Sequence, residues 1–151
     1  MPQTATHSTL EGLLATVENG RRGFAEAADK LDADGHPALA ADMRDLAQQR
    51  LRMSNELKAL AASEGPPIEG GEGTVAGAMH RTLMGLRDAL AGDDPYAVLA
   101  AAEQGEDHAV AEFEKALAEE LPMTVRSVVQ RQHEEVLTAH ERVRALRDNS
   151  R

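Results

Sequence analysis

The sequence of 151 residues contains no cysteine and almost no aromatic side chains. Without thiols the chain forms no disulfide, no iron–sulfur cluster and no zinc site of the cysteine type, and it has no thiolate nucleophile. Its aromatic residues are two phenylalanines and one tyrosine, too few for a surface that stacks nucleotides or single-stranded nucleic acid. These absences exclude several classes of enzyme and binding protein.

The chain also lacks a net positive charge and long hydrophobic runs. The formal net charge is −10, which repels phosphate backbones and anionic membrane surfaces, so we expect neither nucleic acid nor a membrane as partner. No apolar run approaches the roughly 20 residues that span a bilayer. Residues 1–7 are polar and have no signal-peptide core, so the sequence predicts a cytoplasmic protein.

What the sequence has in abundance is Ala, Leu, Glu and Arg, which favours helices. Apolar residues alternate at intervals of three and four, the pattern of amphipathic helices. Ser8 with Glu11 three residues later predicts a capping box at the start of the first helix. The pattern predicts four long helices, over residues 8–31, 37–63, 95–120 and 124–147.

The connections between these helices predict the topology. Short turns near Asp34 and Pro122 make two antiparallel hairpins. The segment 64–94 contains a helix of its own and is long enough to cross the whole bundle. The predicted fold is therefore all-α, a ferritin-like four-helix bundle over residues 8–148. An extra short helix lies in the crossover between the second and third long helices, and residues 1–7 (disordered) and 149–151 form tails.

Each long helix has a polar residue in or beside its apolar stripe. Glu18, Arg50 and Glu106 each lie sixteen residues from their turn and His140 lies eighteen away, so all four are expected near mid-bundle. Gln132 lies two turns before His140 on the same helix. The sequence predicts that these five residues form one buried polar cluster. Glu103, three residues before Glu106, shares its helix face and is a candidate second carboxylate.

Three stretches resemble one bacterial family of small helical proteins. The first is residues 105–117, Gly-Glu-Asp-His-Ala-Val-Ala-Glu-Phe-Glu-Lys-Ala-Leu. The second is residues 75–81, Val-Ala-Gly-Ala-Met-His-Arg. The third is residues 130–148, which include Ala-His-Glu-Arg-Val-Arg-Ala-Leu-Arg. The chain resembles domain-of-unknown-function family 2383, which is placed with the ferritin-like bundles, over roughly residues 10–148. The resemblance implies a helical bundle but no activity.

The ferritin-like resemblance implies a test for a metal centre. A carboxylate-bridged di-iron site takes one Glu from each of two helices and a Glu-x-x-His from each of the other two. Glu18, Glu106 and His140 match three of these six donors. Leu137 stands where the predicted helix 124–147 needs a carboxylate. The predicted helix 37–63 offers an amide and a guanidinium, Gln49 and Arg52, at the matching positions. No Glu-x-x-His occurs in the chain.

Two interpretations follow. In the first, Arg50 neutralises the carboxylates, no cofactor is bound, and the chain is a non-enzymatic structural or stress-related interaction protein, with a homodimer or a helical protein as the open choices of partner. In the alternative, the chain is a ferritin-like metalloprotein with oxidase or ferroxidase chemistry. It would bind one or two Fe or Mn ions through Glu18, Glu106, His140 and Glu103. The position of the Arg50 side chain separates the two.

Overall fold

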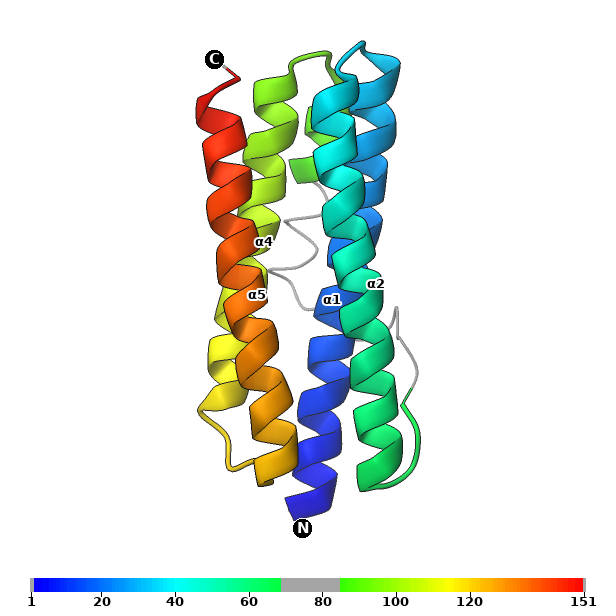
Figure 1. The fold of residues 1–151 in the computed structure, drawn as a ribbon, viewed down its shortest axis with the longest axis vertical. Coiled ribbons are helices and arrows are strands. Elements are labelled where there is room, and N and C mark those ends of the chain that lie inside the picture. The colour runs from blue at the N-terminus through cyan, green and yellow to red at the C-terminus, as the bar shows by residue number, and fades with distance from the viewer. Residues whose placement is uncertain (1, 69–84, 151) are drawn as a thin grey trace.

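Four long helices stand side by side in the structure, a computed structural model that describes residues 2–68 and 85–150 (Figure 1). Residues 85–91 add a short helical segment before the third of them. The described residues contain no strand, which confirms the all-α prediction. The long helices are α1 (Pro2–Ala33), α2 (Pro37–Glu64), α4 (Pro95–Leu117) and α5 (Met123–Asp148).

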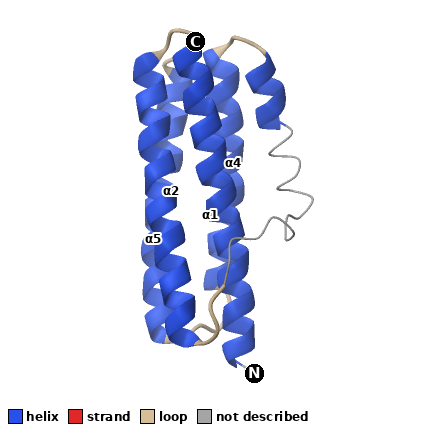
Figure 2. Ribbon diagram, turned by 90° about the vertical axis from the view of Figure 1, so that its right-hand side faces the viewer, coloured by secondary structure: helices blue, strands red, loops and turns tan. Residues whose placement is uncertain are grey.

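The order of the helices in space is that of a bundle with one long crossover. In Figure 1, α1 rises from the N-terminus, α2 and α4 both descend, and α5 rises to the C-terminus. Because α2 ends and α4 begins at opposite ends of the bundle, the link between them is a crossover, the connectivity of ferritin-like folds. The predicted helix in this link is described only over residues 85–91, beside the upper part of the bundle (Figure 2). Its residues 74–84 lie outside the described residues.

Neighbouring helices define which faces meet in the core. Helix α1 packs against α2 and α4, and α5 packs against α4 and α2. Helices α2 and α4 therefore occupy opposite corners of the bundle. Within the described residues, no helix is both long enough and apolar enough to traverse a lipid bilayer.

Local sequence signals set the turns between helices. The first hairpin closes at Gly35, whose φ of 86° lies in the left-handed region that favours glycine. The N–H of His36 donates to the Leu31 carbonyl oxygen at 2.8 Å, and Pro37 then begins α2, as prolines often do at a first helical position. Before α4, the Asp94 carboxylate accepts from the Tyr96 N–H at 3.0 Å and caps the helix.

The core divides into two apolar clusters along the bundle axis. The lower cluster gathers residues 10–17 of α1 with the neighbouring parts of the other helices, and the upper cluster gathers residues 24–31. Between them lies a level where the buried side chains include Arg50 and Glu106. Two of the polar residues predicted at mid-bundle, Arg50 and Glu106, are thus located where the apolar core is interrupted.

The predicted start of the first helix is wrong. Helix α1 begins at Pro2 rather than Ser8, so residues 2–7 are helical instead of a disordered tail. The Thr6 side chain is buried, and the His7 ring nitrogen Nε2 lies 2.9 Å from the Pro66 carbonyl oxygen. Pro66, which follows α2, thus contacts the first part of α1. The sequence near residue 7 contains no signal for a contact with so distant a residue, so the prediction began the helix too late.

Candidate functional site: a buried ion pair and its cavity

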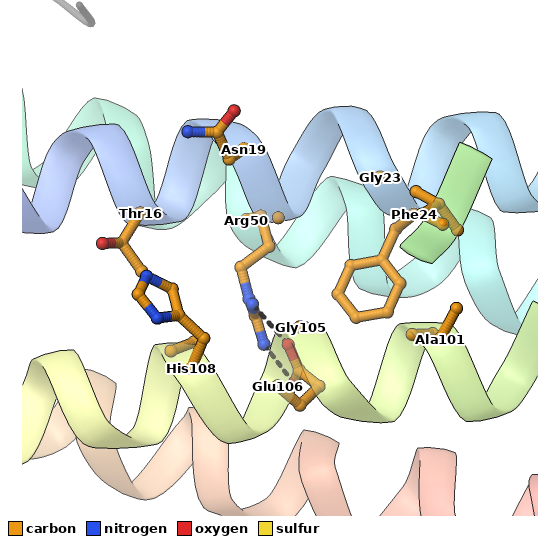
Figure 3. A pocket seen from close by; sticks show the side chains of 13 residues that line it. Thr16, Asn19, Gly23, Phe24, Arg50, Ala101, Gly105, Glu106 and His108 are labelled. Carbon is orange, nitrogen blue, oxygen red and sulfur yellow. Dashed lines mark hydrogen bonds and ion pairs between the residues drawn. The ribbon is translucent and has the colours of Figure 1, made fainter. Parts of the chain in front are cut away.

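The centre of the bundle holds an ion pair between Arg50 and Glu106. Each residue is only 1% exposed. Arg50 donates from Nη1 to Glu106 Oε1 at 2.8 Å and from Nη2 to Oε2 at 2.6 Å (Figure 3). This two-pronged geometry gives the strongest form of carboxylate recognition by arginine. The long side chain thereby joins α2 to α4 across the diagonal of the bundle, which confirms the predicted pairing of Arg50 with Glu106.

Helix α1 and a neighbouring amide complete the surroundings of the guanidinium. The Cζ atom of Arg50 lies 5.2 Å from the centre of the Phe24 ring, within the range of a cation–π contact. Its Nε donates to Gln49 Oε1 at 3.4 Å. A Cβ atom added at Gly20 would lie 3.0 Å from Arg50 Nη1, so α1 presents bare backbone to the guanidinium there. Arg50 is therefore fixed from several sides.

Glu18 is buried but does not join the Arg50 pair, which corrects the predicted cluster. Its Oε1 accepts from the Ser54 hydroxyl at 2.9 Å, and its Oε2 accepts from Arg21 Nε at 3.0 Å. Lys58 Nζ lies 3.6 Å from the same carboxylate. The reason is register: Glu18 and Ser54 are equidistant from residue 36, two residues beyond the turn centre assumed at Asp34.

These contacts keep Glu18 ionised. Burial by itself would raise the pKa of this carboxyl group. The hydrogen bonds from Arg21 and Ser54, with the positive charges of Arg21 and Lys58, outweigh burial and hold the pKa of Glu18 below its ordinary value. Both oxygens of Glu18 are already bonded within α1 and α2.

Gln132 points inward as predicted, but it also lies apart from the ion pair. It is fully buried, and its Nε2 donates to Glu56 Oε1 at 2.8 Å and to the Met53 carbonyl oxygen at 3.3 Å. Its Oε1 has no hydrogen-bond partner within the described part of the chain. Because its described hydrogen bonds go to Glu56 and Met53, Gln132 does not share a polar network with Arg50. Its unbonded acceptor is destabilising.

His140 faces the outer seam between α4 and α5, which corrects its predicted place in the cluster. Its Nε2 lies 2.6 Å from Asp107 Oδ1 and its side chain is 16% exposed. The interior position belongs to Ala139, which is 2% exposed. After Val136 the apolar stripe steps by three residues rather than four. One residue turns a helix by about 100°, enough to move the imidazole out of the core.

The four predicted metal ligands do not converge on one point. Glu106 is held by Arg50, and Glu18 is held by Ser54 and Arg21. Glu103 accepts from Arg147 on the outer seam. Across residues 2–68 and 85–150, no group of three or more His, Asp or Glu side chains is placed to hold a metal ion. The donors Glu18, Glu106, His140 and Glu103 therefore do not fit a carboxylate-bridged di-metal centre.

Sequence reasoning missed a cavity between α1 and α4, next to the ion pair. Its volume is about 60 Å³, and Arg50, Glu106 and Phe24 line one side of it. Glycines and alanines from the two facing helices make most of the remaining wall. The half-buried His108 points from α4 toward Thr16 of α1 at one end (Figure 3). The sequence feature that could have indicated a cavity is the set of small residues on the facing helices, at positions 20, 23, 101, 102 and 105.

The comparisons with known proteins decide the family. The sequence model of the family described as "Domain of unknown function (DUF2383)" matches residues 5–119. The chain belongs to this family. The matched stretch contains α1, α2 and α4 with both partners of the ion pair, whereas α5 lies beyond it. Among curated proteins, none matches the chain. Membership of DUF2383 brings no assigned activity, so a function has to be argued from the residues themselves.

Proposed function

We propose that this DUF2383 protein is a non-enzymatic helical bundle, a structural or stress-related interaction protein of the bacterial cytoplasm. The observation that supports this most is the hold of Arg50 on both oxygens of Glu106. The interior carboxylate that a metal centre would need is already neutralised by a permanent cation. We propose accordingly that the chain works without a cofactor.

The chemistry of arginine makes this hold difficult to exchange for a metal ion. A guanidinium does not lose its proton and has no lone pair to offer a metal. A metal ion at Glu106 would stand close to a fixed positive charge in a medium where charges are poorly screened. Moving Arg50 aside would break its contacts with Phe24 and Gln49 as well.

The experiment that tests this proposal measures metal content and iron oxidation. The protein is loaded with Fe(II), Mn(II) or Zn(II) in turn, dialysed, and analysed by inductively coupled plasma mass spectrometry. We expect far less than one equivalent of metal per chain, and Fe(II) oxidation no faster than in buffer. One or two equivalents that survive dialysis, or rapid oxidation that disappears in Glu106→Ala, would establish the metalloprotein alternative instead.

The interaction role has its own measurement. We propose a homodimer or a helical protein as partner, and neither nucleic acid nor a membrane, because the net charge of −10 disfavours anionic surfaces. Light scattering on the eluate of a size-exclusion column gives the mass in solution. A dimer mass supports self-association, and a monomer mass at high concentration restricts the proposal to a second protein. Binding to duplex DNA or anionic vesicles at physiological salt would contradict it.

A further inference from the structure

We propose that the cavity between α1 and α4 binds a small neutral molecule with one hydrogen-bond acceptor and a short apolar body. Short-chain amides, ketones and alcohols belong to this class. This inference goes beyond the proposed interaction role and does not depend on it. It rests on the size of the cavity, on its apolar wall, and on the unused hydrogens of Arg50.

The size of the cavity limits the ligand to a few atoms. Its volume is about 60 Å³. A water molecule takes about 30 Å³ in the liquid, so the space suits about two waters or one molecule of comparable size. Pockets for drug-sized ligands are several times larger. The wall includes the Phe24 ring, the Leu86 side chain and Ala101, which favour an apolar body.

Arg50 supplies the polar contact. An arginine has five N–H donors, and three of them are used in the bonds to Glu106 and Gln49. Among residues 2–68 and 85–150, no acceptor takes the other two N–H groups of this side chain, which is 1% exposed and lines the cavity. A buried donor without an acceptor is destabilising, so a ligand that brings an acceptor gains more here than at the surface.

The charges next to the cavity select a neutral ligand. Arg50 and Glu106 neutralise each other, so this pair gives the wall opposite charges but no net charge. An anion that approaches Arg50 also approaches Glu106, and a cation that approaches Glu106 also approaches Arg50. Either ion would in addition lose its hydration against an apolar wall, which is strongly unfavourable. A neutral acceptor avoids both penalties.

Three molecules of nearly the same shape test this selection: acetamide, acetate and acetamidinium, with charges of zero, minus one and plus one. Each is titrated into the intact protein while ¹H–¹⁵N spectra record the Arg50 Nε–H and the Gly20 and Gly105 amides. We expect acetamide to cause saturable shifts of these signals with a dissociation constant on the order of millimolar. Acetate and acetamidinium should bind at least about tenfold more weakly.

A pair of variants on α4 tests the location. Ala101→Leu fills the cavity, whereas Ala111→Leu adds the same side chain at an exposed position of the same helix. We expect Ala101→Leu to abolish the acetamide shifts and Ala111→Leu to retain them. If Ala101→Leu fails to fold, the three ligands on the unaltered protein still decide.

Three results would overturn the proposal. Absence of saturable shifts with acetamide would mean that the cavity holds solvent only. Acetate or acetamidinium binding as tightly as acetamide would remove the selection for a neutral ligand. Unchanged acetamide binding in a folded Ala101→Leu variant would place the ligand elsewhere.

Discussion

Two arginines in this bundle make ion pairs of the same length in opposite surroundings. Arg50 Nη2 lies 2.6 Å from Glu106 Oε2 in the core, and Arg142 Nη2 lies 2.6 Å from Asp42 Oδ1 between α5 and α2. The Arg50 side chain is 1% exposed and the Arg142 side chain is 39% exposed. Distance alone does not distinguish the pairs, whereas exposure does.

The difference in exposure changes what each pair does for the fold. An exposed pair is screened by water and contributes about 0–1 kcal/mol to stability. In a buried pair, the free energy lost when both charges leave water is offset only by their attraction to each other. Each charge therefore depends on the presence of the other. The interior pair therefore specifies which residues of α2 and α4 face each other, whereas loss of the surface pair should cost about 1 kcal/mol or less.

The largest expected effect comes from breaking the interior pair. Arg50→Ala leaves the Glu106 carboxylate buried without its cation, and we expect the free energy of unfolding to fall by about 3–5 kcal/mol. Urea denaturation followed by circular dichroism measures the change. Arg142→Ala is the matched control and should lower stability by about 1 kcal/mol or less. Equal losses in the two variants would mean that the interior pair is hydrated like a surface pair.

Removing both charges should undo the damage. In the double variant Arg50→Met with Glu106→Leu, neither charge of the interior pair remains and the apolar volume is largely kept. Buried pairs replaced in this way are often neutral or stabilising, by about 1–4 kcal/mol. We expect a melting temperature at or above that of the unaltered protein. A double variant as unstable as Arg50→Ala would show that packing, rather than unpaired charge, explains the loss.

The sequence predicts which residues face the interior of the bundle better than it predicts which of them contact each other. Helix faces follow from the spacing of apolar residues, so the inward positions of Arg50, Glu106 and Gln132 were predicted correctly. Contacts between helices depend on register. The centre of the first turn was predicted two residues too early, so Glu18 was paired with Arg50, whereas it contacts Ser54. In α5 the interior position was predicted one residue too late, at His140 instead of Ala139. Because each residue rotates a helix by about 100°, His140 faces outward instead of into the core.

The cavity was not predictable in this way. It depends on how closely α1 and α4 approach and on the exact path of the Arg50 side chain. Small residues such as Gly20 and Ala101 allow either close helix contact or empty space, and the sequence does not choose between them. That choice is made by the packing of the whole bundle.

The buried carboxylate of Glu18 should give an effect of intermediate size that depends on pH. Its pKa is lowered in the folded protein, so its stabilisation is complete above the ordinary pKa of a glutamate and is lost as pH falls through the folded value. Ser54→Ala removes one donor to the carboxylate and should lower stability at pH 7 by about 1–3 kcal/mol. Urea unfolding at pH 7 and pH 3 should show a smaller loss at the lower pH. A loss that is the same at both would assign the effect of Ser54 to packing.

The smallest expected effect compares two glycines of α1. Replacing a glycine inside a helix by alanine usually stabilises by about 0.5–1 kcal/mol. At Gly12 a new Cβ atom meets no atom of the described residues within 4 Å, so Gly12→Ala should show this full gain. At Gly20 the new atom lies 3.0 Å from Arg50 Nη1, and Arg50 has little freedom to move because Glu106 and Gln49 hold it. Gly20→Ala should therefore gain nothing or destabilise.

The background of the substitution distinguishes this contact from a local property of the helix. In an Arg50→Ala background the guanidinium is gone, so Gly20→Ala should recover the gain seen at Gly12. The difference between the two backgrounds is the coupling energy of Gly20 and Arg50, and residues in contact typically couple by about 0.5–3 kcal/mol. Additive effects would mean that Arg50 moves away from α1 freely. In that case the interior pair would not hold the guanidinium in place, and the contrast with Arg142 would rest on exposure alone.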